Sequence, residues 1–307
     1  MFENLWTEKY RPHTLEDIIL PDDIKDIFKQ AKEVGAIPNL LFVSVPGTGK
    51  TSLAKILVND ILDCQYMYIN ASDENGIDTI RTKITNFSQT MSLDGKMKVI
   101  ILDEADGITL DGQNALRNTM EEHADITRFI LTANYDYKII KALRSRCELY
   151  SFAPEIDKIV ERIIYILEQE SITWEEEDEK TLRSIVKHNY PDIRKIIGIV
   201  RQSSTTGAFK YTLKSTSKSF LKELTTKCIK SPLSVRQYAI NNEEEFSGDY
   251  AQLLRAFFNY VDETIKSEDV RQKILITISD YIYKSSFVMD QEINFYACCL
   301  EINEILK

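Results

Sequence analysis

The 307-residue sequence has five cysteines, and no two of them are spaced as a Cys-x-x-Cys pair. That spacing is typical of structural zinc sites and of dithiol redox motifs, so the sequence indicates neither. Only three histidines are present, and because they are scattered we assign none of them a catalytic role. We expect the cysteines to be reduced core residues of a cytosolic protein: Cys64, Cys147, Cys228, Cys298 and Cys299.

Long apolar runs are also missing. No run approaches the roughly 20 residues needed to span a bilayer, and the first residues lack the apolar core of a secretion signal. We therefore expect no membrane association and a cytoplasmic location. Basic residues number 38 against 48 acidic ones, and the net charge of −10 argues against a protein that coats DNA by bulk electrostatics. A local basic surface is still compatible with this composition.

The first half of the chain contains five short apolar runs separated by helix-length segments. Strands that alternate with helices predict an α/β fold with a five-stranded parallel sheet covered by helices on both faces. Such sheets bind ligands at the carboxyl ends of their strands. The runs are Asn39–Val43, Tyr66–Asn70, Lys98–Leu102, Arg128–Ala133 and Cys147–Phe152.

Helical patterns fill the second half. Pro154 follows the fifth run, and residues 155–201 show helical spacing, interrupted by the acidic run Glu175–Glu179, which we expect to be a solvated loop or a helix start. The S-S-T-T-G stretch at 203–207 is typical of a linker, and apolar residues recur at helical spacing beyond it. Because the chain is too long for one comfortable core, we expect an α/β domain (1–153), a small helical domain (154–206) and a helical C-terminal domain (207–307).

The first run is followed by S-V-P-G-T-G-K-T at 44–51 and then by a helical segment. Glycines let backbone N–H groups curl around phosphate, and the helix N-terminus adds positive potential. The segment predicts a nucleotide-binding P-loop in which Lys50 meets the β and γ phosphates and the Thr51 hydroxyl ligates Mg²⁺. Ser44 stands where the strict pattern has glycine, and an ordinary loop is the alternative.

Polar residues at later strand ends extend the predicted site. Asp103 and Glu104 follow the third run, where one acidic residue alone would be explained as a turn or cap. Two of them downstream of a phosphate loop predict hydrolysis, with Asp103 holding Mg²⁺ through water and Glu104 orienting the attacking water. Asn134, after the fourth run, either positions that water or is a strand-end hydrogen-bonding residue. Arg146, before the fifth, is either a surface ion-pair residue or an arginine finger for a neighbouring subunit.

Ser-Arg-Cys at 145–147 resembles a motif of replication factor C-type clamp loaders, which are AAA+ ATPases. The short length, Ser44 and the segment Asn189–Lys195 look closest to the large subunit of T-even-type phage clamp loaders, which would place the protein in the host cell cytoplasm. The last hundred residues match this family only in helical character and length. Further matching segments occur in the family's order: Trp6–Pro12, Asn70–Asp73, Asp103–Asp106 and Gln113–Glu121.

The resemblance implies an AAA+ domain, a helical lid and a helical collar that joins subunits, with ATP and Mg²⁺ as cofactors. Asn134 becomes the first sensor, Arg194 the lid arginine that reaches the γ-phosphate, and Arg146 the finger. Asn70 is expected to restrain Glu104 until DNA arrives. The implied nucleotide site comprises Glu8, Lys9, Tyr10, Ile19, Pro46, Gly47, Thr48, Gly49, Lys50, Thr51, Ser52, Asp103 and Arg194.

The resemblance also implies partners: a sliding clamp, primer–template DNA, and copies of this chain with a different subunit in a pentamer. We expect DNA phosphates to meet a helix that opens at Asn75–Ile77 and carries Arg81 and Lys83, a solvated helix face being the alternative. We expect Ile108 and Leu110 to face the clamp, burial against the following helix being the alternative.

The sequence thus predicts an ATPase subunit that opens a clamp and places it on primer–template DNA. The rivals are another AAA+ motor, such as a branch-migration helicase or an unfoldase, and a non-catalytic scaffold subunit. An unfoldase needs an aromatic–apolar–glycine pore loop, which residues 71–78 lack. A scaffold subunit is expected to lose Lys50, Glu104 or Arg146, and a P-loop kinase explains neither Arg146 nor the helical C-terminal third.

Overall fold

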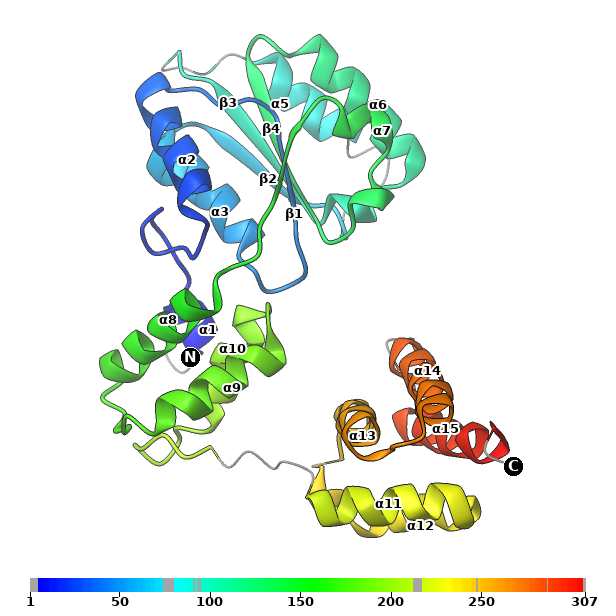
Figure 1. The fold of residues 1–307 in the computed structure, drawn as a ribbon. Helices are drawn as coiled ribbons and strands as arrows, with labels where there is room; N and C mark the ends of the chain where they lie inside the picture. Colours follow the sequence, from blue (N-terminus) through cyan, green and yellow to red (C-terminus); the bar gives the residue numbers. More distant parts are fainter. Residues whose placement is uncertain are drawn as a thin grey trace. The chain divides into compact units, whose positions relative to one another are not determined.

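The computed structural model describes residues 5–73, 80–90, 92, 95–211, 217–246, 248–285 and 287–305. Two compact units divide the chain, one of residues 1–211 and one of residues 212–307 (Figure 1). The first unit therefore continues past residue 206, because Phe209 is buried among its helices and Thr173 pairs with Ala208 in a parallel bridge. The finer domain boundaries stay predictions.

A five-stranded parallel sheet forms the centre of the first unit, with strand order β2-β3-β4-β1-β5. The predicted fold class is confirmed. The strands of the interior are continuous apolar runs because both faces of the sheet are covered, and all six residues of β3 are buried. The strands are β1 (Leu40–Val43), β2 (Tyr66–Asn70), β3 (Lys98–Asp103), β4 (Thr127–Ala133) and β5 (Glu148–Ser151).

Helices cover the two faces of this sheet (Figure 1). On one face, α2 (Asp22–Val34), α3 (Lys50–Ile56) and its π-helical continuation η1 (Leu57–Ile61) share a core with Phe42 and Ile101. On the other, Leu41 and Ile100 pack with residues of η2 (Ile80–Ile84), α6 (Leu110–Glu122) and α7 (Lys141–Arg144). The remaining short elements are α5 (Thr85–Gln89), η3 (Ala105–Gly107) and η4 (Asp136–Lys138).

The first unit also contains a small group of helices after β5. These are α8 (Ile156–Gln169), α9 (Asp178–Asn189) and α10 (Ile193–Gln202), and their buried side chains form a separate cluster. Trp6, on the N-terminal helix α1 (Trp6–Lys9), is buried in that cluster. The acidic run at 175–179 lies at the start of α9, which is where a helix favours negative charge.

The second unit is helical throughout its described residues, as predicted. Its core includes Phe246, Leu253 and Phe257, and three of the free cysteines, Cys228, Cys298 and Cys299, are buried there. Its helices are α11 (Lys218–Lys230), α12 (Pro232–Asn241), η5 (Glu243–Glu245), α13 (Tyr250–Thr264), α14 (Glu268–Lys284) and α15 (Gln291–Ile305). Across the described part of the chain, no helix is long and apolar enough to cross a membrane.

Candidate nucleotide-binding site

The loop between β1 and α3 has the backbone shape that its glycines allow. Gly47 and Gly49 have φ angles of 81° and 96°, in the left-handed region that glycine adopts most readily. Ser44, where the strict pattern has glycine, is not in that region; its hydroxyl donates to the carbonyl of Phe152 at 2.9 Å. A serine at this position therefore ties the loop to the end of β5 without straining it.

Lys50 is the buried cation of this loop. Its Nζ donates to the carbonyls of Ser44 (2.7 Å) and Val45 (3.0 Å) and to Oδ1 of Asn134 (2.9 Å). Burial lowers the pKa of Lys50, and the nearby carboxylates of Asp103, Asp106 and Glu104 oppose that shift. No ion pair to Lys50 occurs among the described residues, so its charge faces neutral acceptors at the point where a phosphate would bind.

Asp103 accepts hydrogen bonds from three hydroxyl groups. Thr51 donates to both carboxylate oxygens, at 2.8 Å and 3.0 Å, Thr132 to Oδ1 at 2.6 Å, and Tyr68 to Oδ2 at 2.7 Å. Burial, with the bond to Asp103 as the next cause, raises the pKa of Tyr68, so the phenol stays a donor at neutral pH. A carboxylate beside a threonine hydroxyl is the oxygen donor set that Mg²⁺ prefers, so these residues fit the ion.

Glu104 lies next to this network in an unusual backbone conformation. Its φ of 55° is left-handed, which costs a non-glycine residue about 1–3 kcal/mol. Its N–H donates to Thr132 Oγ1 at 3.0 Å, and its carboxylate accepts a hydrogen bond from the Ser72 hydroxyl. The expected contact with Asn70 is wrong, because the Asn70 side chain is used locally, by Asp73 and by the N–H of Ser72.

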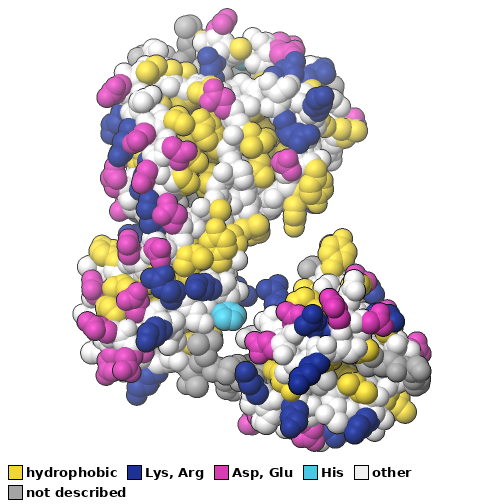
Figure 2. All heavy atoms as spheres, in the orientation of Figure 1, with side chains coloured by type: hydrophobic (Ala, Val, Ile, Leu, Met, Phe, Trp, Pro, Cys, Tyr) yellow, Lys and Arg dark blue, Asp and Glu magenta, His cyan; other side chains and the backbone are white. Residues whose placement is uncertain are grey.

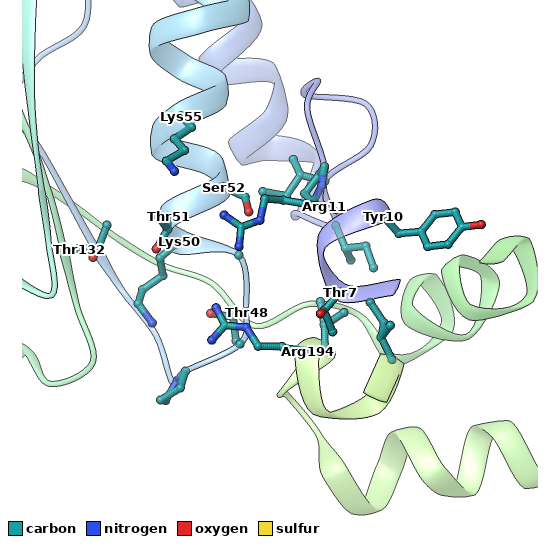
Figure 3. Close-up of a pocket in the computed structure, with 18 of the residues that line it drawn as sticks. Thr7, Tyr10, Arg11, Thr48, Lys50, Thr51, Ser52, Lys55, Thr132 and Arg194 are labelled. Carbon is teal, nitrogen blue, oxygen red and sulfur yellow. The ribbon is translucent and has the colours of Figure 1, made fainter. Parts of the chain in front are cut away.

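The start of α10 is packed directly against the phosphate loop. The N–H of Ile193 donates to the carbonyl of Gly47 at 3.2 Å, and Asp192 caps the helix by accepting from the N–H of Lys195 at 2.9 Å. A Cβ on Gly47 would lie 1.9 Å from Oδ1 of Asp192. Figure 3 shows the Arg194 side chain pointing toward Thr48 and Lys50. The positive charge of Arg194 contributes to lowering the pKa of Lys50.

These elements enclose a cavity of about 320 Å³, within the range that binds small molecules. The structure brings most of the predicted residues together in its lining: Tyr10, Ile19, the loop and helix residues 46–52, Asp103, Glu104, Asn134 and Arg194. The sequence reasoning missed Arg11, Tyr68, Thr132 and Arg162, which also line it. Strand alternation could have found two of them, because Tyr68 and Thr132 lie two residues before Asn70 and Asn134.

Glu8 and Lys9 do not line the cavity, contrary to expectation. Lys9 Nζ pairs with Glu170 at 2.7 Å, and Glu8 accepts from Arg11 at 2.7 Å, so both side chains are engaged elsewhere. Arg146 is also outside the lining. It pairs with Glu121 and donates to the carbonyl of Ala142 at 2.6 Å, with one third of its side chain exposed.

The residues predicted to contact the clamp and DNA differ in their exposure. Ile108 is 5% exposed and packs in the core beneath α6, so its assignment to the clamp surface is wrong; Leu110 is 64% exposed. Lys83 is exposed on η2, whose backbone includes Arg81, but the Arg81 side chain is not described. The expected helix start at Asn75–Ile77 lies outside the described residues.

Comparison with known proteins agrees with this geometry. Residues 40–155 match the family described as ATPase family associated with various cellular activities (AAA). The chain is 44% identical to the replication factor C small subunit of Saccharolobus solfataricus and 43% identical to that of Sulfurisphaera tokodaii, over 211 residues in each case. These alignments cover 67% of this chain but 63% and 64% of the relatives, so the chain spans less than two thirds of their length.

A solved structure shares the fold. The Holliday junction branch migration motor RuvB of Thermotoga maritima superimposes with a TM-score of 0.55 at 17% identity, covering 76% of this chain and 85% of that one. The likeness to replication factor C that the motifs indicated is confirmed for the aligned part of the chain. With its parallel sheet, phosphate loop and paired carboxylates, the segment 40–155 is an AAA family domain.

Proposed function

We propose that this chain is the ATP-hydrolysing subunit of a sliding-clamp loader, which opens a ring-shaped clamp and places it on primer–template DNA. One observation carries the proposal. Lys50, Thr51, Asp103 and Glu104 converge on a single cavity, and Arg194 faces the same cavity from α10. The replication factor C relatives support the loader reading over the part of the chain that they cover. RuvB, at 17% identity, supports the fold alone.

Each residue has a distinct role in this proposal. Lys50 and Arg194 neutralise phosphate charge, and the backbone N–H groups around Gly47 and Gly49 cradle the phosphates. Thr51 would ligate Mg²⁺ and Asp103 would hold the ion through water, and the bound ion would supply charge neutralisation on the phosphate oxygens. Tyr10 and Ile19, which precede the phosphate loop in the sequence, also line the cavity, and we place the adenine beside them.

Glu104 is the residue we assign to the attacking water. Its carboxylate is bonded to Ser72 in this structure, and its backbone is held by Thr132. Asn134 contacts Lys50 at 2.9 Å, so it links the phosphate-binding cation to the end of β4. A water between Glu104 and Asn134 would be oriented by one acceptor and one amide.

Two substitutions test this chemistry. Lys50→Ala should lose ATP binding, because the loop loses its only side-chain cation. Glu104→Gln should bind ATP normally and lose turnover, because an amide no longer accepts the water's proton. Equilibrium binding and phosphate release are measured for both, with Glu33→Gln on the exposed side of α2 as control. Undiminished hydrolysis by Glu104→Gln contradicts the role of that carboxylate.

The site is proposed to be shared between subunits. Arg146 is exposed in part and outside its own chain's cavity, which suits a finger that completes a neighbour's site. Arg146→Ala should bind ATP and hydrolyse it about 10³–10⁵-fold more slowly. Mixing it with Lys50→Ala subunits should restore some turnover, because each variant supplies the half that the other lacks. No rescue in assemblies shown to be mixed contradicts sharing.

We further propose that DNA and the clamp meet different parts of the first unit. DNA phosphates are assigned to Arg81 and Lys83 on η2, and the clamp to a surface that includes Leu110. Acidic and basic side chains are interspersed on the face drawn in Figure 2, which suits a duplex held by a few basic groups on each subunit. We also propose that copies of this chain assemble with a different subunit into a pentamer. The proposed location is the cytoplasm.

A further inference from the structure

Tyr68 lines the cavity, and the proposed binding and hydrolysis of ATP do not use it. It lies on the edge strand β2, where Asn70 pairs in register with Asp103. Because side chains alternate along a strand, Tyr68 and Asp103 lie on the same face of the sheet. Tyr68 is 40% exposed, and its ring centroid lies 4.8 Å from Nζ of Lys55, which is one helical turn after Thr51 on α3. The residue thus spans the space between α3 and the end of β3.

The three hydroxyls on Asp103 are not equivalent. Thr132 donates to Oδ1 alone and Tyr68 to Oδ2 alone, whereas Thr51 donates to both oxygens at longer distances. The Thr51 hydroxyl is the group that would ligate Mg²⁺, so it is the donor that Asp103 would lose if the ion were bound. Thr132 and Tyr68 then remain, with one hydroxyl on each oxygen, and together they fix the rotation of the carboxylate.

We propose that Tyr68 is a positioning residue for Mg²⁺: its hydroxyl holds Oδ2 of Asp103 so that the carboxylate stays aimed at the ion bound with ATP. The inference rests on the proposed ATPase function. Groups that orient a metal-binding carboxylate typically change metal affinity by about 10–100-fold when they are removed. Tyr68 does not bind the nucleotide in this proposal, so nucleotide binding without Mg²⁺ is independent of it.

The test compares Tyr68→Phe with the parent and with Tyr66→Phe in the full-length chain. Tyr66 is a half-exposed tyrosine on the same strand and face, and within the described residues its hydroxyl makes no hydrogen bond, so it is the matched control. Binding of a fluorescent ATP analogue is measured in EDTA and over a Mg²⁺ titration. In Tyr68→Phe the Mg²⁺ concentration at half-maximal enhancement should rise at least about 10-fold. Tyr66→Phe should match the parent, and binding in EDTA should be equal in all three proteins.

A second variant separates the hydroxyl from the ring. Tyr68→Leu also removes the ring from Lys55, and it should show the same Mg²⁺ shift because both variants lack the hydroxyl. A shift in Tyr68→Leu without one in Tyr68→Phe overturns the inference, as does a parent-like midpoint in both. Weaker binding of Tyr68→Phe in EDTA also overturns it, because the residue would then contact the nucleotide. A parent chain that binds no ATP, or binds it without regard to Mg²⁺, overturns the proposed function as well.

Discussion

The contact between Gly47 and Asp192 makes a sharp prediction about the coupling of α10 to the phosphate loop. In Gly47→Ala, the new Cβ would lie 1.9 Å from Oδ1 and 2.5 Å from Cγ of Asp192, so the carboxylate must move. That movement breaks its hydrogen bond to the N–H of Lys195, which caps α10. Loss of an N-cap costs about 0.5–2 kcal/mol. The left-handed φ of 81° adds about 1–2 kcal/mol for a residue with a Cβ.

Gly35→Ala is the matched control. Gly35 has a similar φ of 68°, but a Cβ placed there meets no atom within 4 Å. It should lose only the conformational term, about 1–2 kcal/mol, whereas Gly47→Ala should lose about 1.5–4 kcal/mol. Urea unfolding without nucleotide, followed by tryptophan fluorescence, measures both. Trp6 and Trp174 are the two tryptophans and both pack with the helices of the first unit, so the signal reports on that unit.

A double variant assigns the excess cost to the contact itself. In an Asp192→Ala background the clashing atoms are absent, so adding Gly47→Ala should cost no more than Gly35→Ala costs in the parent. Equal destabilisation of the parent by Gly47→Ala and Gly35→Ala would contradict a clash with Asp192. Persistence of the excess when Asp192 is removed would also contradict it.

Three further predictions follow from side chains outside the cavity. Leu110→Asp should abolish clamp binding and change the free energy of unfolding by less than about 0.5 kcal/mol, whereas Ile108→Asp should cost more than about 3 kcal/mol, because it buries an unpaired charge. Pull-down with the clamp and urea unfolding separate the two. Replacing Arg81 and Lys83 by Ala should flatten the log–log salt dependence of DNA affinity by about 0.9 per lost phosphate contact, with basal hydrolysis unchanged; an identical slope contradicts the assignment. Lys98 is 1% exposed, and its ammonium donates to the carbonyls of Phe87 and Thr90. Lys98→Met should lower the free energy of unfolding by about 1–3 kcal/mol, because both carbonyls lose their donor. An unchanged midpoint in urea unfolding contradicts that role.

The sequence predicted the sheet well because its three interior strands, β1, β3 and β4, are short apolar runs buried on both faces, a pattern with few alternative explanations. The site residues at strand ends and in the glycine loop were predictable for the same reason, since parallel strands place their carboxyl ends at one edge. Tyr68 and Thr132 were missed because a tyrosine or threonine inside a strand is common, and only strand register shows that both reach Asp103. Lys98 was unremarkable as a strand residue until its distant acceptors were known.

Other errors have equally specific causes. Ile108 and Leu110 are two residues apart and both apolar, so composition could not distinguish the buried one from the exposed one. The bend after β3 points Ile108 into the core, while Leu110 begins α6 with its side chain outward. The family resemblance predicts Glu8 and Lys9 at the nucleotide, largely through backbone and apolar contacts. Their side chains form ion pairs with Arg11 and Glu170, respectively.

The proposed role of this chain, ATP-driven loading of a clamp, is tested by steady-state ATP hydrolysis in the assembled loader. The rate is measured alone, with the replicative clamp from the same source, with primer–template DNA, and with both. The highest rate is expected with both present, and Glu104→Gln should lose that rate. A rate that neither the clamp nor DNA changes would contradict the loader assignment, while leaving the match of residues 40–155 to the AAA family in place.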